Sequence, residues 1–210
     1  MENSANLYQA ILTGNLAQAI ETTRQEIEKQ VSPQTIINEQ MMKAMEEIGA
    51  RFEAGKAFVP ELLMAARAMK GSLDLLKPLM TGTSGCTMGT VVIGTVKGDL
   101  HDIGKNLVAS MLEGCGFTVI NLGVDISSDK FVSAVKEHHA SIVCMSALLT
   151  TTMEYMEEVI RALTDAGVRK TVKVMIGGAP VNKSFAQQIG ADGYSDNANA
   201  AVSLARTLLA

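Results

Sequence analysis

The sequence predicts an α/β protein in three parts: an N-terminal four-helix bundle over residues 1–80, a glycine-rich linker over 81–89 and a doubly wound, parallel five-stranded sheet over 90–210. Three observations predict it. Up to about Met80, apolar residues recur only at helical spacing. Residues 81–89 are small, polar and rich in glycine, which is typical of a linker. Beyond them, β-branched runs alternate with amphipathic segments, the pattern of a parallel sheet covered by helices.

Four helical segments account for the N-terminal part. Ser32 and Pro33 form a helix start, with serine as N-cap and proline at the first helical position. Gly55 ends that helix, and Pro60 opens the last one. The four segments are expected over 7–12, 16–30, from 33 to 55, and from 60 to about 76. Because the joints between them are short, a small bundle is expected.

Five strand and helix pairs fill the C-terminal part. Strands are expected at 90–96, 117–122, 141–146, 172–176 and near 193–194, and helices at 103–115, 128–138, 152–166, 182–189 and 197–209. This alternation favours the flavodoxin-like (Rossmann-type) strand order 2-1-3-4-5. In that order the carboxyl ends of strands one, three and four are neighbours, and open α/β sheets bind ligands at that edge.

Composition argues against several classes of function. The net charge of -4 provides no basic field for nucleic acid. No apolar run approaches the roughly 18 residues that cross a bilayer, and the first residues lack the features of a signal peptide, so we expect a cytoplasmic protein without membrane contact. The cysteines Cys86, Cys115 and Cys144 are odd in number and lack metal-ligand spacing, so free thiols are expected.

The first strand is followed by a polar loop with one histidine. Its seven residues are Gly98, Asp99, Leu100, His101, Asp102, Ile103 and Gly104. An imidazole two positions after a carboxylate suits a metal ligand, because the carboxylate can accept the other ring N–H and fix the tautomer. The glycines would let a bulky group approach the backbone. The same residues are also compatible with a plain polar loop.

Two further loops should lie beside this one. After the third strand comes a hydroxyl-rich run from Ser146 to Thr152 that includes Leu148 and Thr150, and after the fourth comes Gly177-Gly178. Backbone and hydroxyl donors around a glycine-lined slot suit a long, partly polar ligand inserted between the strands. Alternatively, the hydroxyls cap the next helix and the glycines form a tight turn, and both interpretations can hold together.

Taken in order, Asp99-x-His101-x-x-Gly104, Ser146-x-Leu148 and Gly177-Gly178 resemble the signature of corrinoid-binding domains. Such domains occur in methionine synthase, corrinoid-dependent mutases and the corrinoid proteins of anaerobic methyltransferase systems. The run from Phe58 to Leu63 resembles the start of the last helix in the helical cap domain of the methyl-carrying branch, which the mutases lack.

The resemblance implies a cobalamin or related corrinoid, with His101 as the lower axial cobalt ligand and Asp99 as its hydrogen-bond partner. The cofactor's nucleotide tail would lie beside Ser146, Leu148, Thr150 and Gly177-Gly178. Thr152 stands where methionine synthase has a serine that completes a His-Asp-Ser proton relay, so His101, Asp99 and Thr152 are the implied catalytic residues. Phe58 and Leu62 would lie over the upper face of cobalt.

The implied function is that of a corrinoid methyl carrier rather than a complete enzyme, since 210 residues leave no room for substrate modules. Its implied partners are a substrate:corrinoid methyltransferase, a methylcorrinoid:tetrahydrofolate or other acceptor methyltransferase, and a reductive activase. An O-demethylase system with an aromatic methyl ether donor ranks first, and methylamine, betaine or methanol systems are the alternative.

Three other classes fit the sequence less well. A receiver-type signalling domain needs an aspartate after its third strand, where this chain has Ser146. A nicotinamide or flavin enzyme needs G-x-G-x-x-G, which the run from Gly94 to Gly98 does not supply. A zinc hydrolase needs more ligands, and the adjacent His138 and His139 cannot both face one metal.

Overall fold

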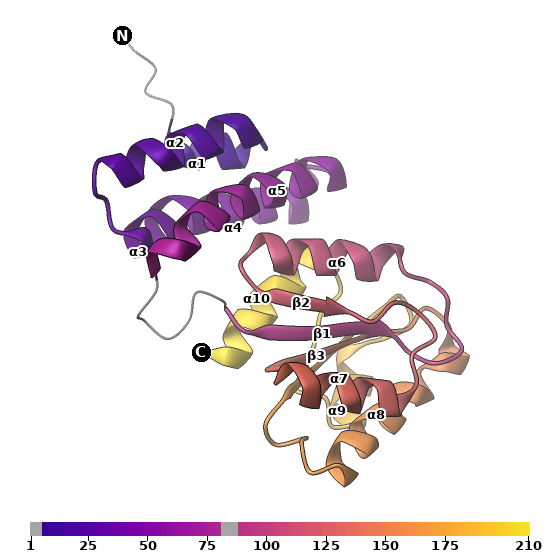
Figure 1. The fold of residues 1–210 in the computed structure, drawn as a ribbon. Helices are drawn as coiled ribbons and strands as arrows, with labels where there is room; N and C mark the ends of the chain where they lie inside the picture. Colours follow the sequence, from indigo (N-terminus) through magenta and orange to yellow (C-terminus); the bar gives the residue numbers. More distant parts are fainter. Residues whose placement is uncertain (1–5, 81–87) are drawn as a thin grey trace. The chain divides into compact units, whose positions relative to one another are not determined.

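The computed structural model describes residues 6–80 and 88–210, which divide into two compact units, one helical and one built on a sheet (Figure 1). Residues 81–87 of the expected linker lie outside the described residues, and Gly89 leads directly into the first strand. Over the described ranges, no helix is long and apolar enough to cross a bilayer.

The helical unit contains the expected segments, with one irregularity. The elements are α1 (Leu7–Leu12), α2 (Leu16–Glu28), α3 (Pro33–Ile36), a π-helical segment η1 (Ile37–Met41), α4 (Met42–Glu53), α5 (Val59–Leu76) and a 3₁₀ turn η2 (Lys77–Met80). The Oγ of Ser32 accepts the amide of Thr35 at 3.1 Å, as the predicted N-cap requires. The π-helical turn was not predicted, because it changes hydrogen-bond partners without interrupting the apolar spacing.

The second unit is a five-stranded, all-parallel sheet with the order β2-β1-β3-β4-β5, which confirms the predicted topology. Its strands are β1 (Thr90–Thr95), β2 (Thr118–Asn121), β3 (Ile142–Ser146), β4 (Lys173–Gly177) and β5 (Gly193–Tyr194). Its helical elements are α6 (Ile103–Gly114), α7 (Ser128–His138), the 3₁₀ turn η3 (Thr150–Thr152), α8 (Glu154–Asp165), α9 (Lys183–Gln188) and α10 (Ala198–Leu209).

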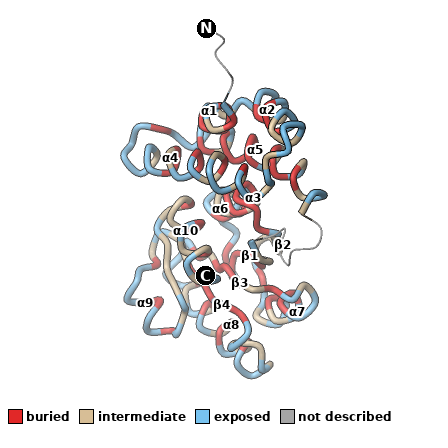
Figure 2. The backbone as a smooth tube through the Cα atoms, turned by 90° about the vertical axis from the view of Figure 1, so that its left-hand side faces the viewer, coloured by how far each residue is buried: buried red, intermediate tan, exposed pale blue. Residues whose placement is uncertain are grey.

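Helices cover both faces of the sheet, α6 and α10 on one and α7, α8 and α9 on the other (Figure 1). The strands β1, β3 and β4 are therefore nearly continuous runs of buried residues (Figure 2). Phe131 of α7 is fully buried and belongs to the same hydrophobic core as Val92 and Val143 of the sheet. Each such aliphatic or aromatic side chain contributes about 1.5–3 kcal/mol by its burial.

The strand register aligns the loops that the sequence singled out. Thr95, the last residue of β1, pairs with Ser146, the last of β3, and Ser146 pairs with Gly177, the last of β4. Three carboxyl ends thus share one row of the sheet, and the loops that follow them meet at one edge.

Candidate functional site

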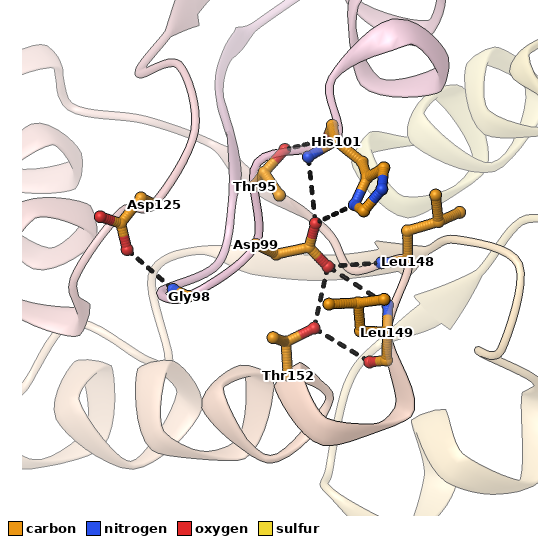
Figure 3. A network of polar contacts seen from close by, with 8 residues as sticks. All are labelled: Thr95, Gly98, Asp99, His101, Asp125, Leu148, Leu149 and Thr152. Carbon is orange, nitrogen blue, oxygen red and sulfur yellow. Dashed lines mark hydrogen bonds and ion pairs between the residues drawn. The ribbon is translucent and has the colours of Figure 1, made fainter.

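His101 lies in the loop between β1 and α6, with about half of its side chain exposed (51%). Its Nδ1 is 2.7 Å from Oδ1 of Asp99 (Figure 3). Because the Asp99 carboxyl is ionised at neutral pH, Nδ1 carries the proton and donates it. No hydrogen bond engages Nε2 within the described part of the chain, so this nitrogen keeps a free lone pair for a ligand.

The carboxylate of Asp99 is fully buried and accepts five hydrogen bonds. Its Oδ1 accepts the backbone N–H and the ring N–H of His101, at 3.1 and 2.7 Å. Its Oδ2 accepts the amides of Leu148 and Leu149, at 2.7 and 3.3 Å, and the hydroxyl of Thr152, at 2.8 Å (Figure 3). Burial acts to raise the pKa of Asp99, but the bonds from Leu148, His101 and Thr152 outweigh it and hold that pKa well below its usual range.

This shift predicts a pH dependence of stability. Below the ordinary aspartate pKa of about 3.9, the unfolded chain takes up a proton at Asp99 while the folded chain does not. The contribution of Asp99 is therefore complete above that pH and is lost as the pH falls. The free energy of unfolding of the full chain should fall more steeply between about pH 4 and pH 3 than that of the Asp99→Asn variant. Urea titrations of both proteins at several pH values measure this, and equal slopes would contradict it.

Thr152 extends the hydrogen-bonded chain into the protein. Its side chain is nearly buried, and its Oγ1 lies 2.8 Å from Oδ2 of Asp99 and 2.9 Å from the carbonyl oxygen of Leu149. A hydroxyl has a single proton, so it can be donated to one of these oxygens at a time. His101, Asp99 and Thr152 therefore form one continuous chain in which a hydroxyl proton has two acceptors.

The other hydroxyls of this segment behave differently. Thr150 and Thr151 are exposed, and Ser146 is partly exposed at the end of β3. No side chain caps η3 or α8, so the alternative in which this hydroxyl row serves as helix caps is wrong. Ser146 and Thr150 remain at the sheet edge, where they could meet a ligand.

The fold restricts both glycines at the end of β4: a Cβ on Gly177, the last residue of the strand, would lie 3.0 Å from the carbonyl oxygen of Ser195. A Cβ on Gly178 would lie 1.9 Å from the carbonyl oxygen of Ala147, and the φ of Gly178 is +129°. Its neighbour Gly177 accepts the amide of Ala147 at 3.2 Å. The tight-turn interpretation therefore holds for this pair. Gly104 is the opposite case: a Cβ there would meet nothing within 4 Å, so the fold does not require a glycine at this position.

Large apolar side chains surround the histidine and remain uncovered. Leu100 is 71% exposed and Ile103 is 88% exposed, on either side of His101 in the loop. Leu148 and Leu149, whose amides bind Asp99, are 42% and 43% exposed. Such an exposed apolar patch marks a ligand or partner surface. We call these four residues the apolar rim.

Two predicted cofactor contacts lie in the helical unit. Phe58, the N-cap of α5, is 69% exposed, and its amide donates to Oε2 of Glu61 at 2.8 Å. Leu62 is fully buried, as are Ala65 and Ala68 of the same helix. In this structure, therefore, Phe58 is accessible to a ligand and Leu62 is not.

Two residues that hold the loop around His101 were not predicted from the sequence. Thr95 is buried at the end of β1, and its Oγ1 donates to the carbonyl oxygen of His101 at 2.9 Å. Asp125, in the loop after β2, accepts the amide of Gly98 at 2.7 Å. No motif in the sequence marks either residue, because both contacts depend on how the strands pair.

The donor set fits a metal that brings most of its own ligands. Among the residues that the structure describes, no three His, Cys, Asp or Glu side chains are grouped as a metal site would require. The zinc interpretation accordingly has no support there. A single free imidazole nitrogen, a carboxylate behind it and an exposed apolar rim would instead suit a metal held in a macrocycle, for which the protein supplies a single ligand.

Comparison with known proteins decides the class. Residues 89–203 match a family described as the B12 binding domain, and residues 4–77 match a second family with the same description. The chain belongs to the B12-binding family of corrinoid proteins. Its cofactor is cobalamin or a related corrinoid.

The relatives of this corrinoid protein include methylamine corrinoid proteins of methanogens. Over 182 residues it is 45% identical to dimethylamine corrinoid protein 1 of Methanosarcina acetivorans, covering 86% of this chain and 85% of the relative. Over 193 residues it is 42% identical to trimethylamine corrinoid protein 2 of Methanosarcina mazei, covering 91% and 88%.

Solved structures of cobalamin-binding proteins have the same fold. A cobalamin-binding protein from Desulfitobacterium hafniense superposes with a TM-score of 0.82 at 34% identity, covering 96% of both chains. The methanol:cobalamin methyltransferase complex of Methanosarcina barkeri gives a TM-score of 0.80 at 29% identity, covering 100% of this chain and 81% of that one.

Proposed function

We propose that this corrinoid protein is the methyl-carrying subunit of a methylamine methyltransferase system, with dimethylamine as the first candidate donor. The observation that carries the donor assignment is the 45% identity to a dimethylamine corrinoid protein along most of both chains. The aromatic methyl ether of O-demethylase systems, ranked first on the sequence alone, has no such support. The relatives favour the methylamine alternative.

In this proposal His101 is the lower axial ligand through Nε2. Asp99 holds the proton on Nδ1, which fixes the tautomer that leaves Nε2 free to coordinate and raises its basicity. The apolar rim covers the lower side of the ligand, and the space at Gly104 admits it. The bound corrinoid supplies a cobalt centre that accepts and releases a methyl group.

The nucleotide tail of the corrinoid has a proposed position at the sheet edge. The family resemblance implies that the tail lies beside Ser146, Leu148, Thr150 and Gly177-Gly178, and the register that pairs Ser146 with Gly177 brings these residues to one edge of the sheet. The partly exposed Ser146 and the exposed Thr150 offer hydroxyl donors there. On the other side of the corrinoid, the exposed Phe58 is the proposed contact, whereas the buried Leu62 would first have to become accessible.

Asp99 and Thr152 are proposed to handle the proton that accompanies changes in the strength of the His101 ligand. If His101 took up a proton from water when released from the metal, the imidazolium would add a positive charge to the network. The buried Asp99 carboxylate balances that charge, and the Thr152 hydroxyl can turn from Asp99 to the Leu149 carbonyl.

A methyl carrier needs one partner that delivers the methyl group and another that removes it. The proposed partners are a methylamine:corrinoid methyltransferase, an acceptor methyltransferase that could use tetrahydrofolate or another acceptor, and a reductive activase.

Reduced holoprotein reconstituted with cobalamin tests the carrier role and the donor together. Each candidate donor (dimethylamine, trimethylamine, methanol, an aromatic methyl ether) is added with and without its own methyltransferase. We expect the absorption of methylated corrinoid only with dimethylamine and its methyltransferase together. Methylation without any methyltransferase would overturn the carrier role, and methylation only through the aromatic ether enzyme would overturn the donor.

A further inference from the structure

The segment from Asn121 to Asp125, which leads from β2 to α7, contacts the first residues of the His101 loop. Oδ1 of Asp125 accepts the amide of Gly98 at 2.7 Å (Figure 3), and the amide of Asp125 donates to the carbonyl oxygen of Asp99 at 3.0 Å. Asp125 has a φ of +54°, a left-handed conformation that non-glycine residues seldom adopt and that asparagine and aspartate tolerate best. Its backbone and side chain therefore hold Gly98 and Asp99 together.

The same segment contacts the residues that follow the loop, at the start of α6. Lys105 is 3% exposed, and its Nζ donates to Oδ1 of Asn106 and to Oδ1 of Asn121, at 2.7 Å each. Nδ2 of Asn121 donates to Oδ1 of Asn106 at 3.0 Å. Nδ2 of Asn106 in turn donates to Oδ2 of Asp102, the neighbour of His101, at 2.8 Å.

Burying the ammonium group of Lys105 between α6 and the segment after β2 costs free energy. Within 6–80 and 88–210, no carboxylate lies within ion-pair distance of its ammonium group, so neutral amide oxygens alone receive the buried charge. Burial lowers the pKa of Lys105, and the nearby Asp102 charge acts in the opposite direction. Because a buried cation without an ion pair contributes little to net stability, a role in fixing geometry accounts for it better.

We propose that Lys105 and Asp125 are positioning residues for His101: together with Asn121 they hold the loop at its two ends and so set where Nε2 lies. The inference rests on the proposed role of His101 as cobalt ligand. Between these two ends, the loop is also held by Thr95 and Asp99. Loosening either end should let the imidazole move away from the metal while the sheet stays intact.

Matched variants separate the contacts from their side effects. Asp125→Gly removes the acceptor for Gly98 but tolerates the left-handed backbone, whereas Asp125→Asn keeps an acceptor and tolerates the same backbone. Lys105→Met removes the buried ammonium at similar length, and Lys130→Met, an exposed lysine of α7, is its control. Asn121→Ala, at an exposed position, tests the same end if Lys105→Met does not fold.

Each full-length variant is reconstituted with aquacobalamin, and its dissociation constant and the fraction of histidine-ligated cobalt are read from the visible spectrum. Residues that support a metal ligand typically change affinity by about 10–100-fold, so Asp125→Gly and Lys105→Met should bind about tenfold more weakly and show more histidine-free spectrum. Asp125→Asn and Lys130→Met should match the unaltered protein.

The same substitutions combined with His101→Ala distinguish an effect on the position of His101 from a general disturbance of the cobalamin site. If the two residues act through His101, Asp125→Gly and Lys105→Met should cause no further loss of cobalamin affinity there. The proposal is overturned if both variants keep the original spectrum, or if they lose affinity by the same factor with and without His101. A spectrum unchanged by His101→Ala alone would instead overturn the ligand assignment in the proposed function.

Discussion

Replacing His101 with alanine should convert the cobalamin-loaded protein to a form without a histidine ligand, visible as a shift of its absorption spectrum. The affinity for cobalamin should fall by at least about 10–100-fold, since even residues behind a metal ligand have effects of that size. The fold should persist, because half of the His101 side chain is exposed and no packed core depends on it. Spectral titration with cobalamin and a thermal melt of the unloaded protein measure both effects.

Asp99→Asn is the comparison for that experiment. It keeps one oxygen acceptor near His101 but removes the charge, so the histidine-ligated spectrum should persist with a weaker ligand. An unchanged spectrum in His101→Ala, with cobalamin still bound, would mean that another group ligates the metal.

Gly178→Ala should destabilise the sheet unit by about 3 kcal/mol or more, because it adds both backbone strain and overpacking. The added Cβ would lie 1.9 Å from a backbone oxygen of Ala147, and alanine disfavours a φ of +129°. A flexible side chain could move away from the new methyl group, but a backbone carbonyl between β3 and η3 cannot. Chemical denaturation of the unloaded protein measures the loss.

Gly104→Ala is the matched control. Its Cβ would meet nothing within 4 Å, and alanine favours a helix over glycine by about 0.8–1.0 kcal/mol, so the unloaded protein should be as stable as before or slightly more stable. Its cobalamin affinity should fall, because in the proposed function the corrinoid occupies the open space at Gly104. If Gly104→Ala destabilised the protein as much as Gly178→Ala, the fold would need both glycines and the distinction between them would be wrong.

Local sequence patterns predicted the helices and strands, but they predicted only some of the contacts and the burial of the site residues. Alternating strands and helices predicted the sheet order, because a parallel sheet allows few connections between its strands. Asp99 and His101 are two residues apart, so their contact was visible in the sequence. Leu62 has the same apolar character whether it lies in a core or faces a ligand, so the sequence could not show that it is buried.

Contacts between distant segments were harder to predict. Thr152 was placed in the site by family resemblance, whereas its bond to Asp99 across 53 positions follows from the pairing of β1 with β3. No motif assigned a role to Asp125 or Lys105, and their bonds depend on the conformation of the turn after β2. The π-helical segment η1 leaves no mark in the sequence, because it changes hydrogen-bond partners and keeps the apolar spacing.

The five hydrogen bonds on Asp99 also fix when the site can form during synthesis of the chain. Three of them come from Leu148, Leu149 and Thr152, 49 to 53 positions later. A buried carboxylate without these donors would be costly, so the loop around His101 cannot settle before residue 152 has left the ribosome and β3 has paired with β1. Closing so long a stretch of chain is a late event in folding, and the newly made protein should acquire its corrinoid only afterwards.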